Sequence, residues 1–174
     1  KSMLEEAGVS GLKLKLGYIS SDAVQSAQAL LIQEQLKEVG VTVELAGGDG
    51  TAIANAMKDP DNEYDMYLGG YIMGIDPDTF SSLFENDGAY NYMHYSGYDT
   101  IDQLFEEGRS ELDESARKET YAKLQAAVQD TGAFYPIISN NKILVVNNRI
   151  QGVEDAGLVP VYTFEDTSSL KIAE

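Results

Sequence analysis

The fold is decided by residues 12–45, which read LKLKLGYISSDAVQSAQALLIQEQLKEVGVTVEL. Apolar residues alternate with lysine, glycine or polar residues over 12–18 and again over 41–45, the period of two that is typical of half-buried strands. Between these segments, Ser20-Ser21-Asp22 offers N-cap residues for a helix that ends at Gly40. This strand–helix–strand unit predicts two parallel strands joined by a helical crossover.

The rest of the chain supplies further helices and strands. The residues expected on or near one apolar face of the first long helix are Val24, Ala27, Leu31, Leu36 and Val39. Later patterns predict a helix over 51–58, a strand over 64–71, a short helix from Asp76-Pro77 to Phe84, a helix from the capping-box pattern at 96–99 to about Leu112, another from Asp113 or Ser115 to about Thr131, and strands over 135–139 and 143–147. The fold class is therefore α/β, without a linker that would split the chain into two folded domains.

Composition excludes several classes of function. The 174 residues are 43% hydrophobic and 24% charged, as in an ordinary globular domain, and no apolar run approaches membrane-spanning length. The net charge of -17 repels phosphate backbones, so we expect no nucleic-acid partner. Because cysteine is absent, disulfides and thiolate metal sites are excluded. The start at Lys1-Ser2-Met3 lacks the pattern of a signal peptide, and we expect the chain to be a piece of a longer protein.

The negative charge is concentrated in one stretch. Residues 59–108 contain twelve acidic residues and no lysine or arginine. Residues 64–98 also hold seven of the eleven tyrosines, three of the five methionines and the single histidine, His94. Aromatic and flexible apolar side chains beside carboxylates suit a surface that binds organic cations. A tyrosine-rich core under a solvated acidic face explains the same composition, and both interpretations stay open.

Metal and catalytic motifs receive little support. The segment from Asp59 resembles a calcium loop, but Tyr64 stands where glycine is needed and Gly70 where glutamate is needed. His94 alone does not make a usual zinc site, so no metal and no cofactor is predicted. Asp76 and Asp78 are a candidate acid and base pair, although helix capping already explains both; a carboxylate hydrolase is therefore a minor alternative.

Position in the fold favours one loop as the binding site. In open α/β sheets, ligands bind beyond the carboxyl ends of the strands. Residues 71–78 form the loop that leaves a predicted strand and enters a helix. We therefore expect this loop to contribute to a ligand site.

Several segments together carry a resemblance to a known family. They are residues 1–8, 12–17, 36–45, 64–71 followed by 76–80, and Tyr98-Asp99 followed by a paired-helix segment. In this order they resemble the carboxyl-terminal lobe of the family 5 extracellular solute-binding proteins, the oligopeptide, dipeptide and nickel receptors of ABC importers. The resemblance implies a type II periplasmic-binding-protein-like lobe, with a mixed sheet that starts with the parallel βαβ unit and has flanking helices. It implies a lobe over 1–163 and a tail over 164–174 that returns toward the amino-terminal lobe.

The resemblance also implies a function without catalysis. The chain would form the carboxyl-terminal half of the cleft of an ABC importer's substrate-binding component and bind oligopeptides or dipeptides for uptake. Its partners would be the permease subunits and the amino-terminal lobe, and it would lie outside the cell as a lipoprotein, or in the periplasm. The alternatives are a receptor for another solute, such as a nickel chelate or a sugar, and a peptide-pheromone receptor with the same fold.

The ligand contacts implied by the resemblance lie in two segments. The first-choice residues are Tyr71, Met73, Gly74, Ile75 and Asp76, and the second-choice residues are Tyr90, Asn91 and Tyr95. Family members often have the pattern aromatic-x-x-Asp-x-x-Asp-Pro, in which the first acid binds the peptide's amino group. Here the segment is one residue shorter, Gly74 takes the place of that acid and Tyr71 replaces the common tryptophan. A backbone contact or a different ligand is therefore an alternative to an ammonium contact.

Overall fold

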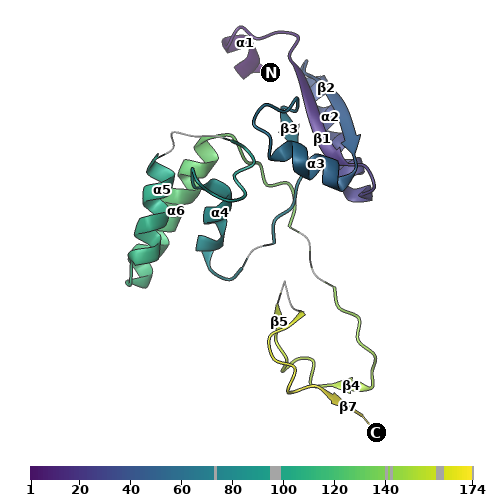
Figure 1. Cartoon of the computed structure of the whole chain (residues 1–174), viewed down its shortest axis with the longest axis vertical. Helices are drawn as coiled ribbons and strands as arrows, with labels where there is room; N and C mark the ends of the chain where they lie inside the picture. Colours follow the sequence, from purple (N-terminus) through teal and green to yellow (C-terminus); the bar gives the residue numbers. More distant parts are fainter. Residues whose placement is uncertain (73, 95–98, 140, 142, 160–162, 174) are drawn as a thin grey trace. The chain divides into compact units, whose positions relative to one another are not determined.

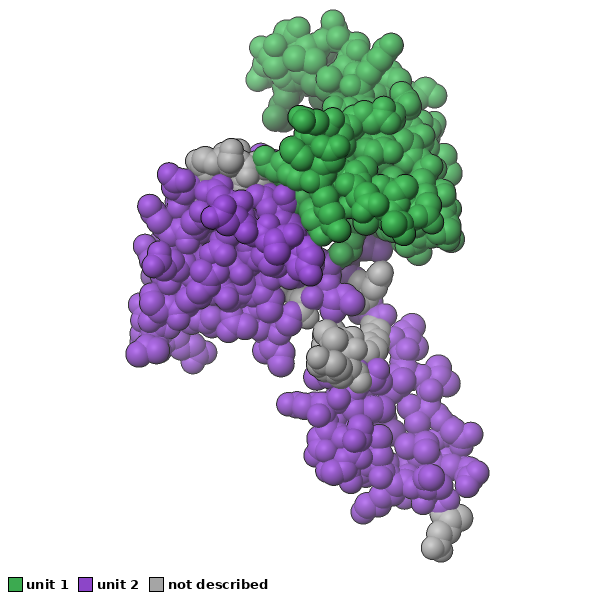
Figure 2. All heavy atoms as spheres, in the orientation of Figure 1, with its two compact units in different colours: residues 1–70, 92–94 green, residues 71–91, 95–174 purple. Residues whose placement is uncertain are grey.

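The chain forms two compact units. The computed structural model describes residues 1–72, 74–94, 99–139, 141, 143–159 and 163–173. One unit contains residues 1–70 and 92–94, and the other contains residues 71–91 and 95–174 (Figure 2). The lobe expected over 1–163 includes parts of both units, so the bounds of the lobe and its tail stay a prediction.

The first unit is built on a three-stranded parallel sheet in the order β2-β1-β3 (Figure 1). β1 (Lys13–Ile19) pairs along its whole length with β2 (Thr42–Gly48). The predicted parallel βαβ unit is therefore confirmed. β3 is confined to Met66–Tyr67, much shorter than the strand expected over 64–71, because only these residues pair with β1.

The crossover helix α2 (Ala23–Glu38) begins where the sequence indicates. The Asp22 side chain accepts hydrogen bonds from the backbone N–H groups of Val24 and Gln25, at 2.8 and 3.1 Å. After the helix, Gly40 adopts a φ of +91°, which glycine accommodates without steric cost.

The buried side of α2 agrees only in part with the expected one: Leu36 and Val39 pack against the core, as expected. Val24 and Leu31 are exposed, whereas Ala29 is fully buried and Ile32 is partly buried against the sheet. Helix α2 carries apolar residues on both sides, and the side with the small Ala29 allows its backbone to approach the sheet closely. The residues of this core are Leu16, Ala29, Val41, Val43 and Leu68.

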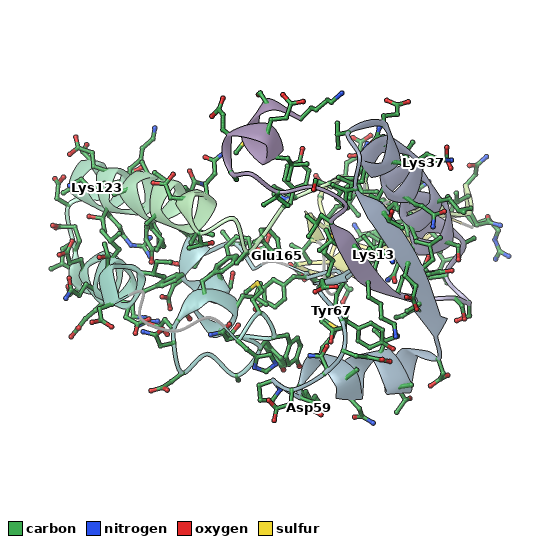
Figure 3. All side chains as sticks on the ribbon, turned by 90° about the horizontal axis from the view of Figure 1, so that it is seen from above. Lys13, Lys37, Asp59, Tyr67, Lys123 and Glu165 are labelled. Atoms are coloured by element: carbon green, nitrogen blue, oxygen red, sulfur yellow. The ribbon has the colours of Figure 1, made fainter. Side chains whose placement is uncertain are left out.

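Two short helices complete this unit, α1 (Ser2–Glu6) and α3 (Gly50–Met57). Asp49 caps α3 by accepting a hydrogen bond from the Thr51 N–H at 2.9 Å. Tyr67 lies against β1 (Figure 3), where a Cβ atom on Gly17 would be only 2.9 Å from its ring. A glycine at position 17 therefore lets the tyrosine pack directly on the strand.

The second unit begins with the 3₁₀ helix η1 (Pro77–Phe80) and α4 (Ser81–Phe84), followed by α5 (Asp99–Ser110) and α6 (Glu114–Asp130). Helices α5 and α6 lie side by side (Figure 1). The buried side chains of these helices are Phe84, Ile101, Leu104, Phe105, Tyr121 and Leu124. The capping-box pattern expected before α5 includes residues 96–98, which lie outside the described residues.

The strands expected at 135–139 and 143–147 are wrong. The described residues of this segment, which are 135–139, 141 and 143–147, form no strand, and Tyr135 and Val145 are largely exposed. Alternating apolar residues favour a strand only where a neighbouring sheet covers them, and a two-stranded hairpin alone is marginally stable. Shorter antiparallel pairs follow instead: β4 (Ile150–Gln151) with β7 (Lys171–Ile172), and β5 (Leu158–Val159) with β6 (Thr163–Phe164).

Within the described part of the chain, no helix combines the length and the apolar character needed to cross a membrane.

Candidate functional site

The loop predicted to bind ligand leads into η1 in the second unit. Asp76 caps this helix, because its Oδ1 atom accepts a hydrogen bond from the Asp78 N–H at 2.8 Å. Pro77 occupies the first turn, where its missing N–H costs nothing. The helix start predicted from Asp76-Pro77 is therefore confirmed, and it fixes the carboxyl end of the loop.

Tyr71, at the other end of the loop, is held by the helices that follow it. Its hydroxyl group donates a hydrogen bond to the Thr79 carbonyl oxygen at 2.8 Å and lies 2.9 Å from the Ser82 Oγ atom. Its ring stacks on Phe80 with centroids 5.9 Å apart. The side chain is 37% exposed, so a fixed aromatic surface faces solvent.

Ser82 connects the two predicted groups of contact residues. Its carbonyl oxygen accepts a hydrogen bond from the Tyr90 N–H at 2.8 Å, while its side chain contacts Tyr71. Asn91 follows directly and donates from Nδ2 to the Glu85 carbonyl oxygen at 3.3 Å. The structure therefore brings Tyr71 together with Tyr90 and Asn91, through a serine that sequence reasoning did not select and that no motif marks.

The middle of the loop is exposed. Ile75 is 93% exposed, and a Cβ atom on Gly74 would lie 2.7 Å from the Thr79 Cγ2 atom. Glycine therefore lets the loop backbone pass close to η1. Met73 and Tyr95, also predicted as contacts, lie outside the described residues.

Two arginines bind the carboxylates at the loop. Arg117 of α6 donates from Nη2 to both carboxylate oxygens of Asp76, at 2.9 and 3.0 Å. Arg109 of α5 donates from Nε to Asp78 at 2.8 Å, and its Nη2 atom lies 2.7 Å from a Glu85 carboxylate oxygen. Sequence reasoning missed both arginines, although Arg109 is the first basic residue after the acidic stretch.

Arg117 is positioned by the packing of α5 against α6. Its Nε atom donates to the Gly108 carbonyl oxygen at 2.8 Å, and its guanidinium group lies 4.9 Å from the centroid of the Tyr121 ring. A Cβ atom on Gly108 would lie 2.8 Å from Tyr121, so the glycine is what allows the two helices to come this close. The helix pair therefore holds the guanidinium group against Asp76.

These contacts favour the ionised form of Asp76. The Asp78 N–H and then the Arg117 guanidinium lower the pKa of the Asp76 carboxyl below its ordinary value. A general acid at neutral pH needs a raised pKa, so this carboxyl does not suit that role. Structural roles account for the carboxylates of Asp76 and Asp78, as capping and ion pairing.

The described residues also bear on the metal candidates. Among them, no group of three or more His, Asp or Glu side chains is placed to hold a metal ion. The segment that resembles a calcium loop forms a turn, in which Asp59 accepts a hydrogen bond from the Asp61 N–H at 3.0 Å. His94 Nε2 lies 2.8 Å from the Met57 carbonyl oxygen, so a structural contact accounts for the single histidine.

The lowered pKa of Asp76 predicts how stability depends on pH. The ionised carboxylate stabilises the folded state above about pH 3.9, and this contribution is lost as the pH falls through the folded-state pKa. Asp76→Asn keeps a capping side chain but removes the charge. Because the ion pair is exposed, we expect wild type to be more stable by at most about 1 kcal/mol at neutral pH.

Urea unfolding of both proteins at neutral pH and at about pH 3 measures this difference. The difference in the free energy of unfolding between wild type and Asp76→Asn should shrink on acidification. A difference that is the same at both pH values would show that the charge of Asp76 does not stabilise the fold.

The fold is similar to that of periplasmic binding proteins. The structure superposes on the ABC transporter substrate-binding protein CtaP of Listeria monocytogenes with a TM-score of 0.89 and 37% sequence identity, covering 99% of this chain and 36% of that one. AppA of Clostridium difficile gives a TM-score of 0.85 at 30% identity, covering 98% of this chain and 36% of that one. Both likenesses extend over almost the whole of this chain.

The family follows from the sequence itself. The sequence model of the bacterial extracellular solute-binding proteins, family 5 (middle), matches residues 1–92. The chain therefore belongs to family 5 of the bacterial extracellular solute-binding proteins. The peptide transport periplasmic protein SapA of Haemophilus influenzae is 26% identical over 151 residues, which are 82% of this chain and 27% of SapA. The chain thus spans about a quarter of the length of this relative.

Proposed function

We propose that this chain is part of the substrate-binding component of an ABC importer that takes up peptides. Family membership supports a solute-binding role without catalysis. The name of SapA, a peptide transport protein, supports peptides as the solute, and CtaP is a substrate-binding protein of an ABC transporter.

One structural observation carries the assignment to the loop after β3. Tyr71, Ile72 and Ile75 expose aromatic and aliphatic surface there. Tyr90 is half exposed, and Ser82 links it to Tyr71, because Ser82 accepts a hydrogen bond from the Tyr90 N–H while its side chain contacts the Tyr71 hydroxyl group. Exposed apolar side chains on a fixed backbone suit the side chains of a bound peptide. The proposed contacts are those expected from the sequence: Tyr71, Met73, Gly74, Ile75, Asp76, Tyr90, Asn91 and Tyr95.

The proposal includes partners and a location. The remainder of the cleft would come from an amino-terminal lobe, and the loaded protein would dock on the permease subunits. The site of action would be outside the cell, as a lipoprotein, or in the periplasm. Closure of the two lobes around the peptide would bury a ligand that one lobe alone leaves largely exposed.

Native mass spectrometry of the whole protein that contains this chain tests the proposal. We expect a series of bound peptide masses in protein purified without refolding. Ile75→Asp should reduce the bound fraction, because it places a charge on the exposed apolar surface, whereas Leu112→Asp should not. Leu112 is the matched control, since it is 97% exposed and lies outside the proposed contacts.

Two outcomes would contradict the proposal. A single non-peptide mass, such as a metal chelate or a sugar, would move the assignment to another solute. Absence of bound peptide, both on purification and after addition of a peptide mixture, would remove peptides as the solute.

A further inference from the structure

The acidic stretch provides less free negative charge at the loop than its composition indicates. The carboxylates of Asp76 and Asp78 are both engaged by arginine side chains at 2.8 to 3.0 Å. The arginines, Arg109 and Arg117, follow the stretch of residues 59–108 that contains no basic residue. Both carboxylates therefore already have cationic partners within the chain, and the expectation of a surface for organic cations stays a prediction.

The pairing of Arg117 with Asp76 is built into the helix pair. The guanidinium group makes one hydrogen bond to Gly108, contacts both oxygens of Asp76 and lies over the Tyr121 ring. A planar guanidinium group fixed on several sides loses little further freedom when it binds a carboxylate. Arg117 is therefore a preorganised partner of the carboxylate.

The proximity of the two charges decides which ligands the loop attracts. An ammonium group in hydrogen-bond contact with Asp76 would also lie within several ångströms of the Arg117 guanidinium group. Its attraction to the carboxylate would then be largely offset by repulsion from the arginine, since Coulomb energy falls only as the inverse of distance. A neutral or apolar group meets no such penalty.

We propose that Arg117 sets the charge selectivity of the site, by cancelling the Asp76 carboxylate so that the loop receives neutral and apolar parts of a peptide rather than its ammonium group. The inference rests on the proposed function. Asp76 remains able to accept a hydrogen bond from a neutral peptide N–H, and Tyr71 and Ile75 supply the apolar surface. Arg117 thus acts on the ligand in two ways, by occupying the Asp76 carboxylate and by repelling an ammonium group placed beside it.

The test compares two forms of one peptide library. A synthetic library of short peptides without lysine is prepared with free and with acetylated amino termini, and both forms compete for the whole protein. The measured quantity is the ratio of free to acetylated peptide that is bound. Arg117→Gln should raise this ratio about tenfold, the effect of roughly 1.4 kcal/mol of uncancelled attraction. Arg117→Lys, which keeps the charge, should restore the wild-type ratio.

Two further variants separate the effect of charge from that of structure. Arg149→Gln removes the same charge outside α5 and α6 and should leave the ratio as in wild type. The double variant Asp76→Asn with Arg117→Gln should also return to the wild-type ratio, because no carboxylate is then exposed. If Arg117→Gln does not fold, the ratio measured for the wild-type protein decides. Our inference expects free and acetylated peptides to bind within about twofold of each other, whereas a direct ammonium contact with Asp76 would favour the free form at least about fivefold.

The outcomes distinguish this inference from the proposed function. If the library binds but Arg117→Gln leaves the ratio within about twofold of wild type, the selectivity role of Arg117 is wrong while the peptide function stands. If neither form of the library binds to the wild-type protein, the peptide function fails, and the inference fails with it.

Discussion

Replacing Phe105 by alanine is expected to lower the free energy of unfolding by about 3–5 kcal/mol. Phe105 is fully buried in α5, with Ile101 one turn earlier also buried. Removing the ring takes away its transfer free energy and leaves a cavity that the packed helices fill only in part. The ring also lies 5.7 Å from the Arg109 guanidinium group, so its loss removes a contact of a residue that binds the loop.

Leu112→Ala is the matched control for this prediction. Leu112 follows α5 and is 97% exposed, so loss of its side chain should change the free energy of unfolding by less than about 0.5 kcal/mol. Urea unfolding monitored by circular dichroism measures both variants. Equal effects of the two substitutions would show that α5 and α6 do not form the core described here.

The helix starts were predictable because capping is local. Asp22, Asp76 and Asp113 each accept a hydrogen bond from a backbone N–H two or three residues later. All the information for such a contact lies within one turn of sequence. The same holds for the glycines after α2 and α6, Gly40 and Gly132, which adopt positive φ values.

Features that depend on distant partners were not predictable. The apolar residues of α2 indicate two candidate faces, and only packing on the sheet selects Ala29 over Leu31. The alternation over 135–139 predicts a strand, but strand formation needs a partner that the described residues do not provide there. Periodicity therefore indicates candidate elements, but partners elsewhere in the chain decide which face of a helix is buried and whether a strand forms at all.

The same division applies to the candidate site. The loop and its cap at Asp76 follow from neighbouring residues, whereas Arg117 lies 41 positions further along the chain. No spacing rule links residues at that separation. The charge distribution gives a partial signal, because a stretch without lysine or arginine must find its counter-charges outside itself, and Arg109 is the first one available.

Gly88→Ala is expected to destabilise the second unit by about 1–3 kcal/mol and to weaken ligand binding. A Cβ atom at this position would lie 2.5 Å from the Ser82 carbonyl oxygen and 3.0 Å from that of Glu85. Both are backbone atoms, which do not move aside as a flexible side chain does. The reason is lack of space, since the φ angle of Gly88 is outside the left-handed region.

The clash falls on a carbonyl group that organises the proposed site. The Ser82 oxygen accepts the hydrogen bond from the Tyr90 N–H, and the Ser82 side chain lies 2.9 Å from the Tyr71 hydroxyl group. Moving the turn to make room for a methyl group would therefore displace Tyr90 from Tyr71. Under the proposed function, we therefore expect peptide affinity to fall. Each tenfold loss of affinity corresponds to about 1.4 kcal/mol of binding free energy.

Gly70→Ala separates this effect from a general intolerance of alanine. A Cβ atom on Gly70 would meet nothing within 4 Å and its φ angle also lies outside the left-handed region. Alanine at such a position restricts the unfolded chain and should be neutral or stabilising by up to about 1 kcal/mol. Urea unfolding and peptide titration of both variants give the comparison. If Gly88→Ala behaves like Gly70→Ala in both measurements, the turn around Ser82 is loosely packed and does not position Tyr90.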